Sequence, residues 1–363
     1  MLTRPFIASP FITSMVVPTG VGASVGGFAG DATPTMNLLA SVSDVLITHP
    51  NVANAAVLQN LPQNALYVEG YALDQFFKNH WALQPVLKNR IGIVYDSNIE
   101  PDMLTLHRNV VNAVKTVYAL DVVGEVLTQE PVRVSCGYTA SGSSTGELQN
   151  PGVILEACQK LIEQGATAIA LCVAMPTLDD KAYQFEGAVD PVGGVEAILS
   201  HLVVSEFKIP CAHAPVFSKA DAQPEWHCIV DERVAAECIA PTFLPCVLTG
   251  LQRAPQIVPN CEKGISLNDL SALVAPVSAL GGVPILSALE NNIPVIAVRE
   301  NKTVLSVDAD ALSKLLPARC LEQLYSVSSY VEACGLLQVL RCGQNVPVGF
   351  RAVSSELRLE RAR

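Results

Sequence analysis

The chain has 363 residues, of which 50% are hydrophobic and only 16% charged, with a formal net charge of −11 at pH 7. This composition can fill a large core and excludes a disordered protein, and the acidic balance argues against a nucleic-acid partner because phosphate would be repelled. Apolar stretches are interrupted before the roughly 18 residues that a membrane span needs, so we expect no membrane partner either.

Strands and helices alternate along the first half of the chain. Short apolar runs that end at a polar or glycine-rich segment indicate strands, and apolar residues near a 3.6-residue spacing indicate helices. The predicted strands are 15–18, 44–48, 65–69, 91–95, 121–128 and 132–135, and the predicted helices are 35–42 and 102–120.

The second half repeats this alternation from Pro151 onwards. Proline favours the first turn of a helix and glycine follows its end, so Pro151 to Gln164 reads as a helix that Gly165 terminates. A fully apolar strand, 168–173, comes next and completes half of a βαβ unit. Further helices are predicted at 194–201, 232–240 and most of 312–337, and further strands at 209–212, 270–274 and 294–298.

This alternation predicts an α/β fold with a mostly parallel, Rossmann-like sheet. The length suits two lobes. We place an N-terminal α/β lobe with a glycine-rich turn at residues 1–140, a C-terminal α/β lobe at 141–345 and a tail at 346–363.

Three glycine-rich turns stand where apolar runs end, at residues 19–31, 141–147 and 281–284. Turns between a strand and a helix expose backbone N–H groups, and α/β proteins bind anions there. Plain tight turns without a ligand are the alternative. The residues predicted to hold an anion are Gly22, Gly26, Gly27, Ser141, Ser143, Ser144, Gly281 and Gly282.

Two of these turns resemble known motifs only in part. The first lacks the third glycine of the dinucleotide-binding fingerprint. Asp31 after it either caps the next helix, which we favour, or binds a cation as part of a ligand site. The second fits the letters of the nucleophile elbow with Ser144 in the middle, but no helix follows directly.

Titratable side chains stand at the ends of several predicted strands. His49, Glu69 and Asp96 each follow such a strand, and Asn51 lies two residues after His49. The carboxyl ends of strands line the crevice of an open α/β sheet, so these residues are candidates for acid–base catalysis and, for Asn51, ligand binding. A structural role for each is the alternative.

A second polar group occupies residues 196–237. His213 is a candidate acid or base, and Glu196 and His201 are candidate ligand contacts, although a separation of five residues fits one helix face poorly. Arg253 is an isolated cation in a neutral loop, which suits either a carboxylate or phosphate ligand or an internal salt bridge.

The cysteines indicate a compartment rather than a site. There are 11, an odd number without C-x-x-C spacing, which favours a reducing compartment, the cytoplasm. Cys211 and His213 with His227 and Cys228 match no zinc pattern, so we expect no metal. The sequence identifies no cofactor, and it leaves a homo-oligomer open.

Several longer segments carry a resemblance to a family. They are residues 20–31, 47–52, 67–74, 89–92, 189–197, 209–215 and 242–248, together with Arg253-Ala254-Pro255. In them the chain resembles the DUF3326 family, an uncharacterised family of cyanobacteria and of plants with chloroplasts. Residues 143–146 depart from the family's serine-glycine turn in being longer or more polar. The resemblance implies a cyanobacterial setting, or the plastid stroma in a plant relative, and implies no activity.

The first hypothesis is therefore an enzyme that acts on a small anionic metabolite, phosphorylated or a carboxylate. The glycine and serine turns hold the anion with help from Arg253, and His49 or His213 transfers a proton with help from Glu69 or Asp96. One alternative is a sugar-nucleotide-dependent transferase, based on residues 281–296. The other is a non-catalytic metabolite-binding or regulatory protein, which a pocket without converging titratable groups would favour.

Overall fold

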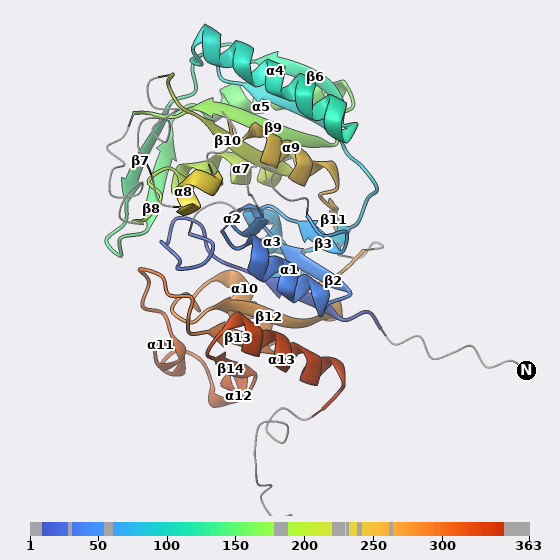
Figure 1. The fold of residues 1–363 in the computed structure, drawn as a ribbon, viewed down its shortest axis with the longest axis vertical. Coiled ribbons are helices and arrows are strands. Elements are labelled where there is room, and N and C mark those ends of the chain that lie inside the picture. The colour runs from blue at the N-terminus through green and yellow to red at the C-terminus, as the bar shows by residue number, and fades with distance from the viewer. Residues whose placement is uncertain are drawn as a thin grey trace, which may run out of the picture.

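Two parallel β-sheets with helices on their faces organise the chain in a computed structural model (Figure 1). The α/β class, the mostly parallel strands and the Rossmann-like character are confirmed. The structure describes residues 9–27, 31–53, 61–177, 188–219, 229, 232–237, 242–260 and 264–344.

The larger sheet, sheet A, has six parallel strands in the order β14-β13-β12-β1-β2-β3. From β1 the chain moves outward to β3, and from β12 it moves outward the other way to β14, so the strand order reverses between β1 and β12 as in a Rossmann fold. The strands are β1 (Ile12–Met15), β2 (Val45–Thr48), β3 (Ala65–Tyr67), β12 (Leu270–Pro276), β13 (Val295–Val298) and β14 (Leu324–Val327).

The smaller sheet, sheet C, has four parallel strands in the order β10-β9-β5-β6. Its central strand β9 consists of small and branched apolar residues buried on both faces, the usual composition of a covered parallel sheet. The strands are β5 (Arg90–Tyr95), β6 (Asp121–Leu127), β9 (Ala168–Ala174) and β10 (Cys211–Val216). Two antiparallel pairs complete the strands: β4 (Trp81–Gln84) with β11 (Gln256–Pro259), and β7 (Val134–Tyr138) with β8 (Ser144–Leu148).

Helices cover both faces of each sheet. Side chains of a strand point alternately to its two faces, and alternate strand residues pack into different core clusters together with the helices on that face. On sheet A, α1 (Thr33–Ser41) and α13 (Tyr330–Arg341) cover one face, and α3 (Gly70–Phe77) and α10 (Val283–Glu290) the other. On sheet C, α4 (Pro101–Tyr118) and α9 (Leu244–Gln252) cover one face, and α5 (Pro151–Glu163) and α7 (Gly193–Phe207) the other. The remaining helices are short: α2 (Pro50–Ala53), α8 (Glu232–Glu237), α11 (Ala309–Ser313), α12 (Ala318–Leu321) and a 3₁₀ turn, Leu267–Asp269.

One hydrophobic cluster contains residues of α3 and α10 together with residues of α5 and α7, so it is shared by the two sheets. Within it α3 and α7 contact each other directly. The start of α3 lies against the middle of α7, where Gly70 and Glu69 contact His201 and Ser200.

The sheets are locked together at a second point beside this cluster. Tyr67 of β3 is buried with residues of sheet C, and its ring lies so close to Gly250 that a Cβ there would be 2.9 Å from it. The Asn89 side chain donates to the carbonyl oxygens of Leu251 and Ala254, each at 2.8 Å. The Tyr67 contact fixes the edge of sheet A against α9. The Asn89 bonds hold the start of β5 to the end of α9 within the sheet C half.

The strands of the two sheets do not divide at residue 140, the lobe boundary predicted from the sequence. Sheet A takes strands from both ends of the chain, and sheet C takes strands from the part between them. The pattern of apolar runs shows where strands lie but not which strands pair, so a division in chain order was the simplest expectation.

Two predicted elements differ from the structure. The predicted helix 312–337 is broken into α11, α12 and α13 with strand β14 among them. Because β14 is a short edge strand with a single fully buried residue, it lacks the apolar run that identified the other strands. The first strand lies at Ile12–Met15 rather than 15–18, within the same apolar segment.

Candidate functional site

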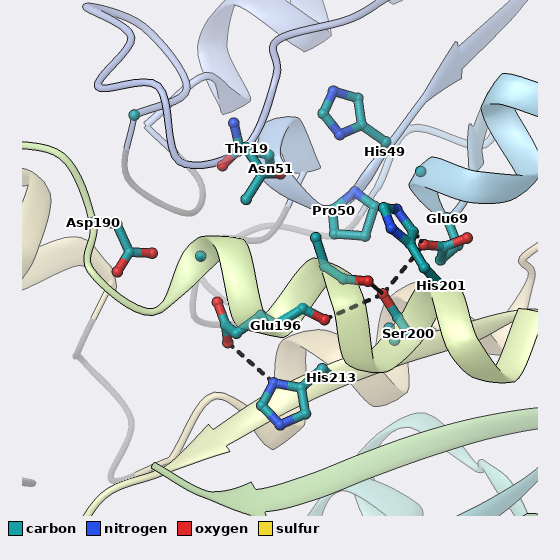
Figure 2. A pocket seen from close by; sticks show the side chains of 15 residues that line it. Thr19, His49, Pro50, Asn51, Glu69, Asp190, Glu196, Ser200, His201 and His213 are labelled. Atoms are coloured by element: carbon teal, nitrogen blue, oxygen red, sulfur yellow. Dashed lines mark hydrogen bonds and ion pairs between the residues drawn. The ribbon is translucent and has the colours of Figure 1, made fainter. Parts of the chain in front are cut away.

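A cleft of about 100 Å³ opens where the carboxyl edge of sheet A meets α7 and β10 (Figure 2). In open α/β folds this edge of the sheet is where ligands bind. The cleft is lined by Thr19, Gly27, His49, Pro50, Asn51, Glu69, Gly70, Asp190, Gly193, Glu196, Ala197, Ser200, His201, Ala212 and His213.

Glu69 and His201 form the first titratable pair of the cleft. Glu69 follows β3 and is the N-cap of α3, where its Oε2 accepts from the amides of Tyr71 and Ala72. Its Oε1 lies 3.1 Å from His201 Nε2 and accepts from the Ser200 hydroxyl at 3.2 Å. Since His201 and Ser200 belong to α7, this contact joins the two sheets at the cleft.

Burial decides where the proton of this pair lies. Desolvation raises the pKa of Glu69 to about 8, although the amides of Ala72 and Tyr71 oppose it, and burial lowers the pKa of His201. Near neutral pH the carboxyl group therefore keeps the proton and the imidazole stays uncharged, as expected for groups taken out of water. The pair thus holds one proton between Oε1 and Nε2 and carries no net charge.

Glu196 and His213 form the second pair. Glu196 lies in the first turn of α7, and its Oε1 is 3.2 Å from Nδ1 of His213 on β10. An Nδ1–H that donates to a carboxylate leaves Nε2 without a proton in the neutral ring. His213 Nε2 is buried and has no hydrogen-bond partner among the described residues.

In each pair one member faces the cleft and the other lies behind it. The side chain of His201 is 41% exposed and that of Glu69 only 3%, while Glu196 is 23% exposed and His213 only 2%. Figure 2 shows Glu196 and His201 on α7, with their partners His213 and Glu69 on other elements. His201 therefore presents an imidazole to the cleft, and its buried partner is the carboxylic acid of Glu69. Glu196 presents a carboxylate, and its buried partner is the imidazole of His213.

His49 is the third histidine of the lining, and its state follows from one hydrogen bond. The Val17 amide donates to His49 Nε2 at 3.0 Å, so Nε2 carries no proton and the neutral ring is protonated at Nδ1. Burial lowers the pKa of His49 to about 4. His49 is therefore an uncharged N–H donor at neutral pH.

The structure brings seven of the predicted site residues to the cleft and leaves the others outside its lining. The seven are Gly27, His49, Asn51, Glu69, Glu196, His201 and His213. Those outside are Gly22, Gly26, Asp31, Asp96, Ser141, Ser143, Ser144, Arg253, Gly281 and Gly282.

The first glycine-rich turn is held by the protein's own side chains. The Gly26 amide donates to Asp31 Oδ1 at 2.7 Å and the Val25 amide to Asn301 Oδ1 at 3.1 Å. The Asn51 side chain donates to three carbonyl oxygens of the same segment, Gly26 among them. The backbone amides of Gly26 and Val25 are therefore occupied and cannot bind an external anion, which is the role predicted for Gly26.

The prediction that Asp31 caps the following helix is wrong. The N-cap of α1 is Ala32, which makes no side-chain cap bond. The Asp31 carboxylate instead turns back to the glycine-rich turn, and burial raises its pKa to about 6 against the hydrogen bonds from Gly26, Ala32 and Gly27.

The serine-rich loop is the tip of the β7–β8 hairpin, not a strand-to-helix turn. The hydroxyls of Ser141 and Ser143 bond to each other and to Thr139. Ser144 connects three segments: its amide donates to Gly20 O, its hydroxyl donates to Pro191 O, and it accepts from the Gly194 amide. The hairpin excludes the nucleophile-elbow geometry for Ser144.

Other predicted residues have structural partners. Asp96 is fully buried and accepts from the amides of Val132 and Ala174, which ties the end of β5 to its neighbours. Arg253 donates to Leu61 O at 3.2 Å. Gly281 and Gly282 precede α10 in the other half of sheet A, where a Cβ at Gly281 would be 3.1 Å from Val307.

Some lining residues were not predicted. Ser200 donates to Glu69, Asp190 Oδ1 accepts from the Val192 amide at the start of α7, and Gly70 lets His201 approach. The one signal in the sequence was the glutamate–glycine pair at 69–70 after a predicted strand. Recognising Ser200 required knowing that α7 crosses that strand end.

No group of three or more His, Cys, Asp or Glu side chains in the described part of the chain could hold a metal ion, while His227 and Cys228 lie outside it. None of the helices among the described residues is long and apolar enough to cross a membrane. Among the described residues, the free thiols include those of Cys136, Cys158, Cys172, Cys211, Cys320, Cys334 and Cys342.

Substituting Gly70→Ala tests the close approach of His201. An alanine Cβ would lie 2.8 Å from His201 Nε2, so we expect the imidazole to move outward and its pKa to rise as its burial falls. Alanine favours a helix, so the free energy of unfolding should stay within about 1 kcal/mol of wild type. NMR titration of the histidine ring protons and urea unfolding measure both. Gly335→Ala in α13, where a Cβ meets nothing, is the matched control; an unchanged His201 pKa in the Gly70 variant would contradict this account.

The buried His49 predicts a pH dependence of stability. Burial lowers its folded-state pKa to about 4, below the usual 6.5 of a histidine. Between pH 4 and 6.5 His49 is therefore protonated only in the unfolded chain. Wild type should lose up to about 3 kcal/mol as pH falls from 6.5 to 4. In His49→Gln this part of the loss should disappear in urea unfolding at several pH values, whereas the exposed His80→Gln should retain it. An equal loss in both variants would be evidence against a buried neutral His49.

Comparison with known proteins places the chain in a family. The model of the family described as "Protein of unknown function (DUF3326)" matches residues 12–348. A protein of Synechococcus sp. named as an uncharacterized lipoprotein is 39% identical over 338 residues, which cover 91% of this chain and 90% of that protein. The resemblance found in the sequence is thereby confirmed: the chain belongs to the DUF3326 family.

Proposed function

We propose that this protein is an enzyme that moves protons on a small metabolite bound in the cleft between the two sheets. The observation that carries the proposal is the pairing of Glu196 with His213 and of His201 with Glu69 around one cleft. Converging titratable groups of this kind are expected of acid–base enzymes and not of a plain binding protein.

Glu196 and His201 are the groups proposed to touch the substrate, because they are the exposed members of their pairs. Glu196 acts as the base that removes a proton, and His201 passes a proton back. Both stand on α7 five residues apart, a rise of about 7.5 Å along a helix. Both also line the cleft, so a small molecule bound there can touch both.

His213 and Glu69 act through their partners. Nδ1–H of His213 orients the Glu196 carboxylate, in the way that a buried third group orients a catalytic pair. Glu69 supplies the proton that lies between Oε1 and His201 Nε2, and Ser200 and the two amides of α3 fix its position. His49 adds a neutral N–H donor, which can polarise an oxygen of the substrate without carrying charge.

We propose the cytoplasm as the location, on the strength of the free thiols in the described part of the chain. The Synechococcus relative bears the name of a lipoprotein, and membrane attachment of this chain is the competing proposal.

Solvent deuterium tests the proton transfer without knowledge of the substrate. Wild-type protein is incubated in D₂O with a cyanobacterial metabolite extract, and mass spectrometry finds the metabolites that gain deuterium. We expect labelling of at least one metabolite, with a loss on the order of 100-fold or more in Glu196→Gln and in His201→Gln.

Two matched variants outside the cleft serve as controls. Glu163→Gln on α5 and the exposed His80→Gln make the same chemical changes away from the lining. They should label at the wild-type rate. Labelling that survives in Glu196→Gln and His201→Gln, or that wild type never produces, would refute the proposal.

A further inference from the structure

We infer that the substrate of the cleft is an aldehyde or ketone that loses a proton from the carbon next to its C=O group, and that His49 binds the carbonyl oxygen. The inference rests on the proposed function, in which Glu196 is the base, and it names the class of substrate. Its basis is a buried N–H donor of His49 that the backbone holds in one tautomer.

The tautomer of His49 is fixed by the end of the neighbouring strand. Strands β1 and β2 pair side by side, and His49 directly follows β2 while Val17 lies two residues after β1. The Val17 amide donates to His49 Nε2 at 3.0 Å, so the proton of the neutral ring is on Nδ1. The other tautomer would leave the buried Val17 amide without an acceptor, which costs stability.

The Nδ1–H group of His49 is left for a molecule in the cleft. His49 is 6% exposed and lines the cleft, and among the described residues none accepts a hydrogen bond from its Nδ1. In Figure 2 no dashed contact joins its ring to another of the lining residues drawn. Buried donors are normally paired, so this one is suited to an acceptor oxygen that a substrate brings.

Other side-chain donors of the lining already have acceptors within the chain. The Asn51 side chain donates to three carbonyl oxygens of the first glycine-rich turn and its approach. The Ser200 hydroxyl donates to Glu69, as do two amides of α3. Among the described residues, His49 is therefore the buried side-chain donor of the cleft that the chain leaves unused.

An uncharged donor and a carboxylate base in one cleft suit the removal of a proton from carbon. Protons on oxygen and nitrogen exchange with water unaided, whereas a C–H bond gives up its proton to a carboxylate where an adjacent carbonyl group takes the electron pair. An aldehyde or ketone does this far better than a carboxylate, whose oxygens already carry charge. Burial lowers the pKa of His49 to about 4, so its N–H stays an uncharged donor, and its hydrogen bond strengthens as the oxygen gains charge.

The proposed step conserves atoms and electrons. The Glu196 carboxylate takes the proton, the pair of the C–H bond becomes the C=C bond of an enolate, and the π pair of the carbonyl group moves to the oxygen at His49. The His201–Glu69 pair returns a proton to carbon, which restores a C=O bond. Glu196 then loses its proton to solvent, and the His201–Glu69 pair regains one from solvent.

The tautomer of His49 can be measured without a substrate. A long-range ¹H–¹⁵N correlation spectrum of the ¹⁵N-labelled protein at pH 7 distinguishes a protonated ring nitrogen from an unprotonated one, and His49→Gln identifies the signals of His49. We expect Nδ1 to carry the proton and Nε2 to carry none. The reverse pattern, or a doubly protonated ring, would overturn the inference whether or not the protein labels a metabolite.

The position of the deuterium tests the substrate class. Metabolites of the cyanobacterial extract that wild-type protein labels in D₂O are treated with sodium borohydride, which reduces a C=O group and raises the mass. A second portion is warmed in alkaline H₂O, which removes deuterium from a carbon next to C=O. We expect the labelled metabolites to respond to both treatments, with heat-denatured protein correcting for spontaneous exchange.

The variant His49→Gln tests the donor itself. The glutamine carbonyl oxygen can replace Nε2 as the acceptor for the Val17 amide, whereas nothing replaces the Nδ1–H group. We expect labelling to fall on the order of 100-fold, as it does when one donor to a developing oxyanion is removed. His80→Gln, at an exposed position outside the lining, should label at the wild-type rate, and urea unfolding at pH 7 checks that both variants are folded.

Deuterium on carbons without a neighbouring carbonyl group, or wild-type labelling by folded His49→Gln, would overturn the inference and leave the proposed proton transfer standing. Absence of labelling by wild-type protein would remove both. The failure of the inference is therefore distinguishable from the failure of the proposed function.

Discussion

Much of the arrangement depends on one buried carboxyl group. Glu69 is 4% exposed and stands at the end of β3, where its Oε2 caps α3 and its Oε1 meets Ser200 and His201 of α7. It therefore ties a strand end of sheet A to a helix that covers sheet C. Gly70 permits this contact because any side chain at that position would meet the imidazole of His201. If Glu69 lost its hold on α7, the cleft would lose both its geometry and one of its two proton-holding pairs.

The two titratable residues that α7 presents to the cleft have different roles. This helix presents Glu196 and then His201 to the cleft, and each is backed by a buried residue of opposite type from another element. Burial keeps a carboxyl group protonated and an imidazole neutral, so the groups can exchange protons near neutral pH without building up charge.

The sequence predicted the class of fold and part of the site for one physical reason. Parallel strands all end at one edge, so residues such as His49 and Glu69, which follow buried runs, had to lie near a common crevice. The same reasoning failed for Asp96, because its strand belongs to sheet C, and sequence periodicity does not assign strands to sheets. The pairing of Glu196 with His213 depends on how α7 lies across β10. The prediction that the glycine-rich turn binds an anion failed for a similar reason. The Val25 amide of this turn donates to Asn301, which is 276 positions away along the chain, and the sequence does not show such a contact.

The most direct test of this account is the coupling between Glu69 and His201. A double-mutant cycle with Glu69→Gln, His201→Gln and the double variant, each measured by urea unfolding at pH 7, isolates the interaction of the two side chains from their separate effects. Direct contact across the two sheets predicts a coupling free energy above about 0.5 kcal/mol, as is usual for residues in one hydrogen-bonded network. Effects that add within about 0.3 kcal/mol would mean that the two groups act independently, and the bridging role of Glu69 would be wrong.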